Sequence, residues 1–497
     1  MSEIRTLLTR AAEELPAAPV PEDLWRKGRR LRRRGRLAAA VAVLVVLLLV
    51  GVPWLMLRPG HTGPATEGAA VPAELYVPWT WQATVQQSPR GSASVLFSGD
   101  GGLRGTDLID HEGKVAVVGR DGSYRMLLYG GAETVAGEQV LLSPNGRYVA
   151  QEGGFETDRA VEVVDLRTGK TRGYSGVVPG GFGRPVAWSP DGRKLLILES
   201  PPVESTAWTT YGEPIVPGSL VVIDLDTPTV TRLASVPDVS GLRTASLAAF
   251  SPDSKHVAVN ANGKLTLYDS HGATEWTTTL GPRRYLAGIG AFTDDGTRIT
   301  VTTLHGCLDN CDDRKLGART WSFGYVAAAT GKPADGPSLA PVRAMAVRAL
   351  GWRHGADLVV VAHRPEPGVT SGGGDWNDTD YWSIGDARLL ALPSGGGRAE
   401  LLIDAPDDVL AIDVARDLLE AGRFGGPSPR PEALPPRWDS VAWYAGCLLC
   451  VLLFVAFVGL LVWVASPRRR TTPPGHGTPP GHATAAGGGP GEVSRRS

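Results

Sequence analysis

The sequence predicts an all-β fold: a β-propeller of four-stranded antiparallel blades, seven or six in number, flanked by two transmembrane helices. Three observations predict it. A Ser-Pro-Asp-Gly turn recurs between pairs of apolar runs, each pair is followed by a third and a fourth run, and uncharged apolar stretches occupy 37–57 and 441–465. Repetition of a four-stranded unit is typical of propellers, where radial closure leaves only short edges.

The first 36 residues combine an amphipathic helix with a basic segment. Four apolar residues share one face of a helix predicted over 2–15: Ile4, Leu7, Leu8 and Leu15. We expect this helix to lie on the anionic inner leaflet or to dock on a cytoplasmic partner, as short segments of transmembrane anti-sigma factors do. Residues 1–36 are too few for a folded cytoplasmic domain.

Two stretches are long enough to cross a bilayer. Residues 37–57 and 441–465 contain 21 and 25 residues without a charge, and about 20 helical residues span the hydrocarbon core. Basic residues precede the first stretch and follow the second, so the positive-inside rule places both chain ends in the cytoplasm and the middle outside the cell membrane. A cleaved signal peptide is the alternative for the first stretch, but no Ala-x-Ala site follows Leu57.

Gly-rich and Pro-rich segments connect the predicted spans to the folded middle. Residues 58–78 are predicted to be a flexible tether and residues 425–440 a Pro-rich linker. The propeller is expected over 79–424. The final segment, 466–497, is expected to be a disordered cytoplasmic tail.

The charge distribution argues against a nucleic-acid partner. Residues 1–36 hold ten basic and five acidic side chains, and residues 466–497 hold five Arg and one Glu. The middle therefore carries a formal charge of −10 in a chain whose net charge is −1. An acidic domain does not offer the basic face that phosphate contacts need.

The recurring turn has a composition that its geometry explains. Pro fixes φ at the first central position, Asp or Asn can bond the nearby backbone, and Gly adopts the positive φ that brings the second strand beside the first. The turn residues are Ser143, Pro144, Asn145, Gly146, Ser189, Pro190, Asp191, Gly192, Ser251, Pro252, Asp253, Thr293, Asp294, Asp295 and Gly296.

Further turn positions at Asp110, Arg353 and Asp413 bring the count to seven, which favours seven blades over six. The last blade then lacks a strand at its C-terminal end, and we expect an N-terminal strand such as 93–99 to complete it. The longer repeats contain loop insertions at 201–218 and 364–382.

The turn followed by a Val- or Ile-rich strand ending in Asp-Leu resembles the repeats of TolB-like and WD-repeat-like propellers. It occurs at 143–146 with 163–166 and at 189–192 with 222–225, and the resemblance extends over about 90–420. The WD-repeat His and Trp-Asp signature is missing, so the TolB-like repeat is the more similar. The resemblance implies a fold and says little about function. High Gly and Pro content, many Arg beside few Lys and the two-span layout also resemble membrane proteins of actinobacteria.

Two cysteines lie outside the predicted membrane segments. Cys307 and Cys311 are expected to form a local disulfide in an oxidising compartment. A metal site that also uses His305 and Asp312 is the alternative, although no second ligand cluster completes it. Free thiols are the third possibility.

Two other motifs are predicted to have structural roles only. Cys447 and Cys450 form a C-x-x-C motif inside the second predicted span, where inert packing is expected. The oxygen-rich segment 375–380 departs from the EF-hand spacing, and a polar turn is favoured over a calcium site.

The sequence contains no HExxH, GxSxG or P-loop motif. We therefore expect a non-enzyme with no cofactor and no metal, acting as a ligand-binding, protein-binding or scaffold module at the cell envelope. The alternative is a transmembrane signalling protein whose cytoplasmic N-terminus docks a regulator such as a sigma factor. A propeller enzyme is the third hypothesis.

Overall fold

The computed structural model describes residues 69–99, 103, 113–129, 135–153, 159–179, 181–201, 207–208, 214–215, 217–236, 246–308, 310–370, 383–407, 409–432 and 438–465. The chain divides into two compact units, Met1–Val441 and Ala442–Ser497. The predicted amphipathic helix with Ile4, Leu7, Leu8 and Leu15, the first predicted span and the C-terminal tail lie outside the described residues.

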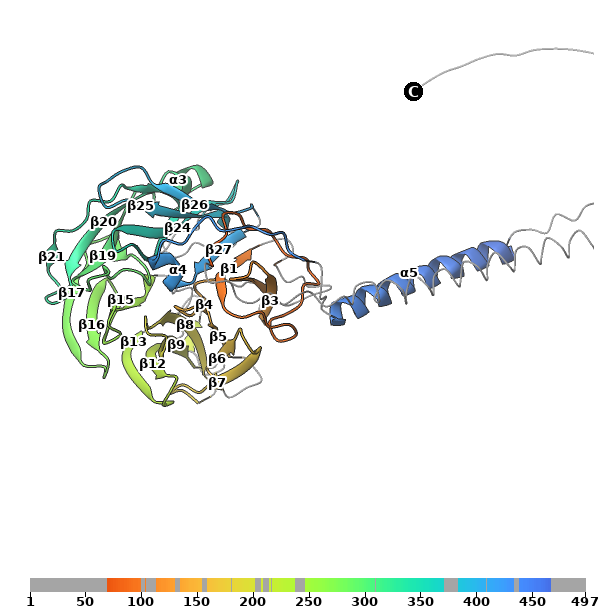
Figure 1. The fold of residues 1–497 in the computed structure, drawn as a ribbon, viewed down its shortest axis with the longest axis horizontal. Coiled ribbons are helices and arrows are strands. Elements are labelled where there is room, and N and C mark those ends of the chain that lie inside the picture. The colour runs from red at the N-terminus through yellow and green to blue at the C-terminus, as the bar shows by residue number, and fades with distance from the viewer. Residues whose placement is uncertain are drawn as a thin grey trace, which may run out of the picture. The chain divides into compact units, whose positions relative to one another are not determined.

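In the described part of the first unit, five antiparallel sheets of four strands and one of five strands form six blades, and Figure 1 shows them arranged around a common centre. The propeller prediction is therefore confirmed. Blade 1 contains β27 (Val409–Val414), β1 (Ala93–Gly99), β2 (Gly113–Gly119) and β3 (Tyr124–Tyr129). Blade 2 contains β4 (Val140–Leu142), β5 (Tyr148–Glu152), β6 (Val161–Asp165) and β7 (Lys170–Tyr174). Blade 3 contains β8 (Phe182–Trp188), β9 (Lys194–Ser200), β12 (Gly218–Asp224) and β13 (Val230–Val236).

The remaining three sheets follow in chain order. Blade 4 contains β14 (Ala248–Phe250), β15 (His256–Ala261), β16 (Lys264–Asp269) and β17 (Thr274–Thr279). Blade 5 contains β18 (Arg284–Leu286), β19 (Arg298–His305), β20 (Thr320–Ala327) and β21 (Pro333–Ala334), and β22 (Val342–Arg343) also pairs with β20. Blade 6 contains β23 (Ala346–Arg353), β24 (Asp357–Pro365), β25 (Ile384–Leu392) and β26 (Glu400–Asp404). The described part of the unit also contains a small hairpin, β10 (Ala207–Trp208) with β11 (Pro214–Ile215), and two short helices, α3 (Asp313–Gly317) and α4 (Arg416–Glu420).

The ring closes by pairing the two ends of the folded chain. β27 pairs antiparallel with β1, with Leu96 opposite Asp413 and Phe97 opposite Ile412. The preference for seven blades is wrong, because the last counted position falls in the sheet that also contains β1 and β2 and does not start a new blade. Asp413 lies in β27, and Asp110, outside the described residues, falls between β1 and β2 in the sequence. The predicted strand 93–99 does belong to the closing blade.

Burial falls from the inner to the outer strands in blades 2 and 4. Every residue of β1 and β27 is buried, whereas β7 and β17 contain mostly exposed or half-exposed residues. The sequences follow this gradient, since the inner strands are rich in Val, Leu and Ile, whereas β7 and β17 consist mostly of Thr and charged residues. Strands that are covered by neighbouring sheets on both faces favour continuous apolar runs, and the inner strands have such runs because they pack between neighbouring blades.

The alternating strand directions give the propeller two different ends. Connections between the first and second and between the third and fourth strands of a blade lie at one end, here called the turn end, and include the repeat turns. Connections between the second and third strands lie at the other end, here called the loop end. In the sequence, the connections between the second and third strands are 100–112, 153–160, 201–217, 262–263, 306–319 and 366–383, and the structure describes 262–263 in full and parts of the others. That of blade 4 is a tight Asn262-Gly263 turn with φ of 52° and 69°, as a two-residue hairpin requires.

The second unit contains most of α5 (Trp438–Ala465), a continuous helix of 28 residues that includes the predicted span 441–465. The structure describes its side chains at Ala442 and 445–458. Within the described part of the chain, no helix provides a stretch long and apolar enough to cross a membrane.

Candidate functional site

The repeat turns share one hydrogen-bond pattern in blades 2 to 5. The hydroxyl of the first residue donates to the side chain of the third, over 2.5–3.0 Å between the two oxygens. That side chain accepts from the backbone N–H of the fifth residue, and the first hydroxyl accepts from that of the sixth. Gly146, Gly192 and Gly296 have φ between 67° and 71°, and Ser254 takes the same region at 59°. The turn residues thus have structural partners.

The turns also contact one another around the turn end. The N–H of Asp191 donates to the Ser254 hydroxyl at 3.3 Å. Helix α4 lies between the turns of blades 2 and 6, because its Asp417 N–H donates to Pro144 O and its Glu420 O accepts from His354 N–H. These bonds tie blade 3 to blade 4 and, through α4, blade 2 to blade 6.

A cavity of about 360 Å³ opens at the turn end between blades 4 and 5. Its walls include the apolar side chains of Phe292 and Trp276 and the carboxylates of Asp253, Asp295 and Glu275. Asp253 and Asp295 already accept hydrogen bonds within their turns. The hydrogen bond from the Thr293 hydroxyl is the largest effect that holds the pKa of Asp295 below its usual value. Two of the three carboxylates therefore serve the turns themselves.

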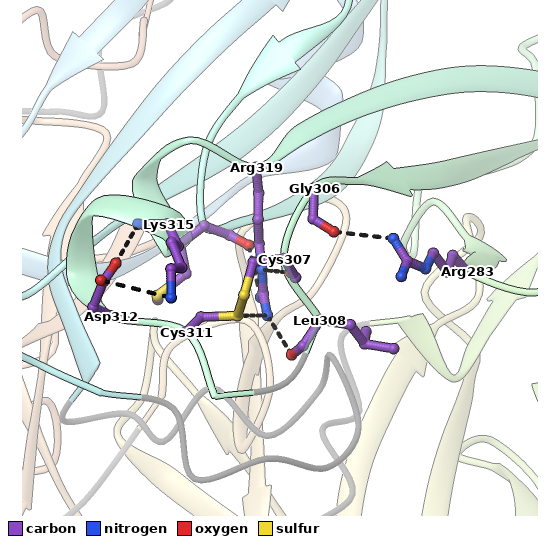
Figure 2. The surroundings of a disulfide bond; sticks show 9 residues. Arg283, Gly306, Cys307, Leu308, Cys311, Asp312, Lys315 and Arg319 are labelled. Atoms are coloured by element: carbon purple, nitrogen blue, oxygen red, sulfur yellow. Dashed lines mark hydrogen bonds and ion pairs between the residues drawn. A yellow bond between two sulfur atoms is a disulfide. The ribbon is translucent and has the colours of Figure 1, made fainter.

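The loop end of blade 5 is closed by a disulfide. Cys307 and Cys311 are joined, with 2.07 Å between the sulfurs, and Cys311 is completely buried (Figure 2). The disulfide leaves neither sulfur available as a thiolate ligand, so the metal site considered for these cysteines with His305 and Asp312 does not form in this state. Arg283 supports the start of the loop through a bond from Nη1 to Gly306 O at 3.0 Å.

A buried arginine fills the space behind the disulfide. Arg319 is 2% exposed, and its guanidinium donates to the backbone oxygens of Cys307 at 2.9 Å and Leu308 at 3.1 Å (Figure 2). The same guanidinium donates to Met345 O at 3.4 Å, just before the first strand of blade 6. Because a buried charge needs several hydrogen bonds, Arg319 fixes the loop backbone to the junction between the two blades.

The loop then connects to the insertion of blade 6. Asp312 caps α3 by accepting from Lys315 N–H at 2.8 Å, and Asp313 accepts from Gly368 N–H at 2.8 Å. A β-bridge pairs Asp312 with Thr370. The bond from Gly368 is the largest effect that lowers the pKa of Asp313, whose carboxylate is therefore ionised near neutral pH. We call the contact between 306–318 and 365–370 the loop platform.

Other proteins resemble this chain only in their fold. The sequence matches no protein-family model and no curated protein. TolB from Acinetobacter baumannii shares 17% identity over 64% of this chain and 67% of its own, with a TM-score of 0.28. A putative TolB from Agrobacterium tumefaciens shares 12% over 65% and 98%, with a TM-score of 0.32. Oligogalacturonate lyase from Vibrio parahaemolyticus shares 14% over 62% and 79%, with a TM-score of 0.31. These values carry no inference about activity.

The structure brings together only some of the residues that the sequence singled out. The repeat turns meet at the turn end, and the two loop cysteines lie at the loop end. The segment 375–380 and most of the insertion 201–218 fall outside the described residues, and Cys447 and Cys450 are reduced in α5. Sequence reasoning missed Arg319 and Asp313, although two aspartates directly before a short helical run are a recognisable N-cap signal.

Proposed function

We propose that this protein is a membrane-anchored binding module. Its propeller lies outside the cytoplasmic membrane and recognises a protein or another ligand with its loop end. The loop platform is the observation that carries the proposal. It braces the base of the long blade 6 insertion with a disulfide, a buried Arg319 and the Asp313–Gly368 hydrogen bond, and rigidly held loops on a stable scaffold are typical binding surfaces.

The proposed location has two supports. A disulfide in the loop platform suits an oxidising compartment outside the cytoplasm. The uncharged segment 441–465 lies within α5, where Phe454 and Val455 expose 66% and 61% of their surface. Contiguous exposed apolar side chains of this kind fit a lipid environment.

The proposal is for binding and not for catalysis. The turn-end carboxylates of Asp253 and Asp295 accept hydrogen bonds from their own turns, and the loop-platform carboxylate of Asp313 accepts from Gly368. Carboxylates that accept hydrogen bonds from their own turns and loops hold those loops in position, whereas a general acid or base must reach a substrate proton.

A labelling experiment tests the location. In a full-length chain with C447S and C450S, a single exposed cysteine is introduced by Val177→Cys, at a residue that exposes 37% of its surface. A membrane-impermeant maleimide is expected to label it in intact cells as strongly as in lysed cells. Labelling only after lysis would contradict the external location.

A crosslinking experiment tests the binding surface. A photo-crosslinking residue is placed at exposed Pro367 in the loop platform, and the matched control carries it at exposed Thr168 at the turn end. Crosslinks to one defined partner are expected from position 367 alone, and D313A should reduce them because it frees Gly368. Equal crosslinking from position 168 would contradict recognition by the loop end.

A further inference from the structure

The segments that lead into and out of the propeller are paired with each other. Val71 N–H donates to Arg423 O at 2.8 Å, and Gly426 N–H donates back to Val71 O at 2.9 Å. Ala73 N–H donates to Gly426 O at 3.1 Å, and Glu74 N–H donates to the Ser428 hydroxyl at 2.8 Å. We call these two segments, 71–76 and 423–430, the clasp.

The clasp is packed onto the propeller and is not a loose crossing of two tethers. Val71 is fully buried and Leu75 is 2% exposed, and both belong to the apolar core that contains blade 1. The guanidinium of Arg430 lies 5.9 Å from the ring centre of Tyr76, at the far end of the clasp. Residues 58–78 and 425–440 were expected to be a flexible tether and a linker. Part of each segment instead belongs to the clasp, where the two segments are paired with each other.

The clasp lies at the turn end of blade 1. Pro429 covers the β2–β3 turn so closely that a Cβ added to Gly122 would come within 2.6 Å of the proline ring. Tyr76 N–H donates to the hydroxyl of Tyr124, the residue that starts β3 directly after the same turn. The C-terminal segment of the clasp, 423–430, follows α4 in the chain, and α4 lies against the repeat turns. The two segments run parallel, so the incoming segment joins the clasp at Val71 and the outgoing segment leaves it at Arg430. Both connections to the rest of the chain therefore start from the turn end of the propeller.

We infer that the turn end of the propeller faces the membrane surface and that the loop end points away from it. This inference rests on the proposed membrane anchoring. Thirteen residues separate Leu57 from Val71, which gives at most about 45 Å of extended chain. Seven residues separate Arg430 from the start of α5 at Trp438, which gives at most about 25 Å. The shorter connection includes Pro431, Pro435 and Pro436, which stiffen it.

The orientation deepens the proposed function. A blade strand such as β2, with seven residues, is roughly 23 Å long, so the loop platform is held about that much farther from lipid than the turns. A binding surface directed away from the bilayer fits a soluble or wall-bound macromolecule, whereas one directed toward it would fit a lipid or a neighbouring membrane domain.

Depth-dependent quenching tests the orientation. The full-length chain with C447S and C450S is reconstituted into phosphatidylcholine vesicles that contain a headgroup-linked quencher. One fluorophore is attached at Arg167→Cys in the exposed β6–β7 turn or at Val177→Cys in the β7–β8 connection. The two sites flank the same strand at opposite ends of blade 2, which makes them a matched pair. Quenching at position 167 is expected to be at least twofold stronger.

Each outcome has a separate meaning. Flotation of the vesicles first establishes whether the chain is membrane-bound, and failure to float would overturn the proposed anchoring itself. If the chain floats but the two labels are quenched equally, or the label at 177 more strongly, the orientation is wrong. Val71→Asp should open the clasp while β27 still pairs with β1, and it should reduce the difference between the two labels.

Discussion

The guanidinium of Arg348, on β23 of blade 6, donates to the backbone oxygen of Ile412, on the closing strand β27, with 2.6 Å between Nη2 and O. The same guanidinium donates to Gly137 O, directly before blade 2. Arg348 is 2% exposed. One buried side chain thus links the last blade, the closing strand and the entry to the second blade, and it supports closure of the ring together with backbone pairing.

Replacement of Arg348 by Met should strongly destabilise the propeller. The change removes the bonds to Ile412 and Gly137 and a positive charge near Asp413, whose pKa is raised by burial and lowered by Arg348. Removal of one member of a buried charge network costs about 3–5 kcal/mol. Urea unfolding of the full-length chain measures the loss. The control R398M changes an exposed arginine and should be neutral, and equal stability of both variants would disprove the role of Arg348.

Gly146→Ala should cost more than Gly263→Ala although both glycines have similar positive φ, 67° and 69°. An added Cβ at Gly146 would lie 2.0 Å from Ala93 O in blade 1, whereas Gly263 has nothing within 4 Å. The second substitution measures the left-handed backbone cost alone, about 1–2 kcal/mol. The first also forces blades 1 and 2 apart, and we expect a total loss above about 3 kcal/mol. Comparable melting temperatures for the two variants would show that blades 1 and 2 can move apart without a loss of stability.

Asp295→Asn should remove a small pH dependence of stability. The folded pKa of Asp295 is lowered chiefly by the Thr293 hydroxyl. Its ionised form therefore stabilises the fold above the unfolded pKa of about 3.9, and this contribution is lost as pH falls through the folded pKa. Because the side chain is 55% exposed, we expect an effect below about 1 kcal/mol.

The measurement for Asp295 is the difference in melting temperature between wild type and D295N from pH 3 to pH 7. Wild type should be the more stable at pH 7, and the difference should shrink as the pH falls below the unfolded pKa of about 3.9. Asn145 forms the same bonds in blade 2 without a charge, so N145D should show the opposite change. A difference that is independent of pH would refute the assignment.

Reduction of the loop disulfide should loosen the neighbouring blade more than it destabilises the whole fold. The C307S/C311S chain opens a ring of few residues, so we expect a loss of at most about 2 kcal/mol in unfolding free energy. Amide exchange at Gly368, which donates to Asp313, should accelerate about tenfold. D313A should accelerate it while the disulfide stays closed. Unchanged exchange in the cysteine variant would show that the disulfide does not support the loop platform.

The repeated local chemistry made the fold predictable. The expected strand 93–99 coincides with β1, Ala93–Gly99, and the expected positive φ occurs at Gly146, Gly192 and Gly296. Each turn is specified by four neighbouring residues, so sequence alone contains its geometry. The turn keeps its geometry even where the repeat has diverged, since Ser254 adopts the positive φ that glycine adopts in the other turns.

The remaining features depend on contacts between distant residues. Asp413 was counted as the start of a further blade, but it lies opposite Leu96, more than 300 positions away. The clasp between Val71 and Gly426 has no periodic pattern, and Pro and Gly there indicate a tether. Arg319 carries no motif and gains its role only when blades 5 and 6 are side by side. Contacts between residues so far apart in the sequence leave no local pattern, so they become visible only in the folded structure.

The partnership of Ala93–Gly99 with Val409–Val414 also sets the order of events during biosynthesis. Val409 follows Gly99 by 310 positions, so at 5–20 residues per second it is made about 15–60 s later. Through that interval the first blade offers an open strand edge to any nascent neighbour. Newly made chains therefore keep an unpaired strand edge, which can pair with other chains, until their last strand is made.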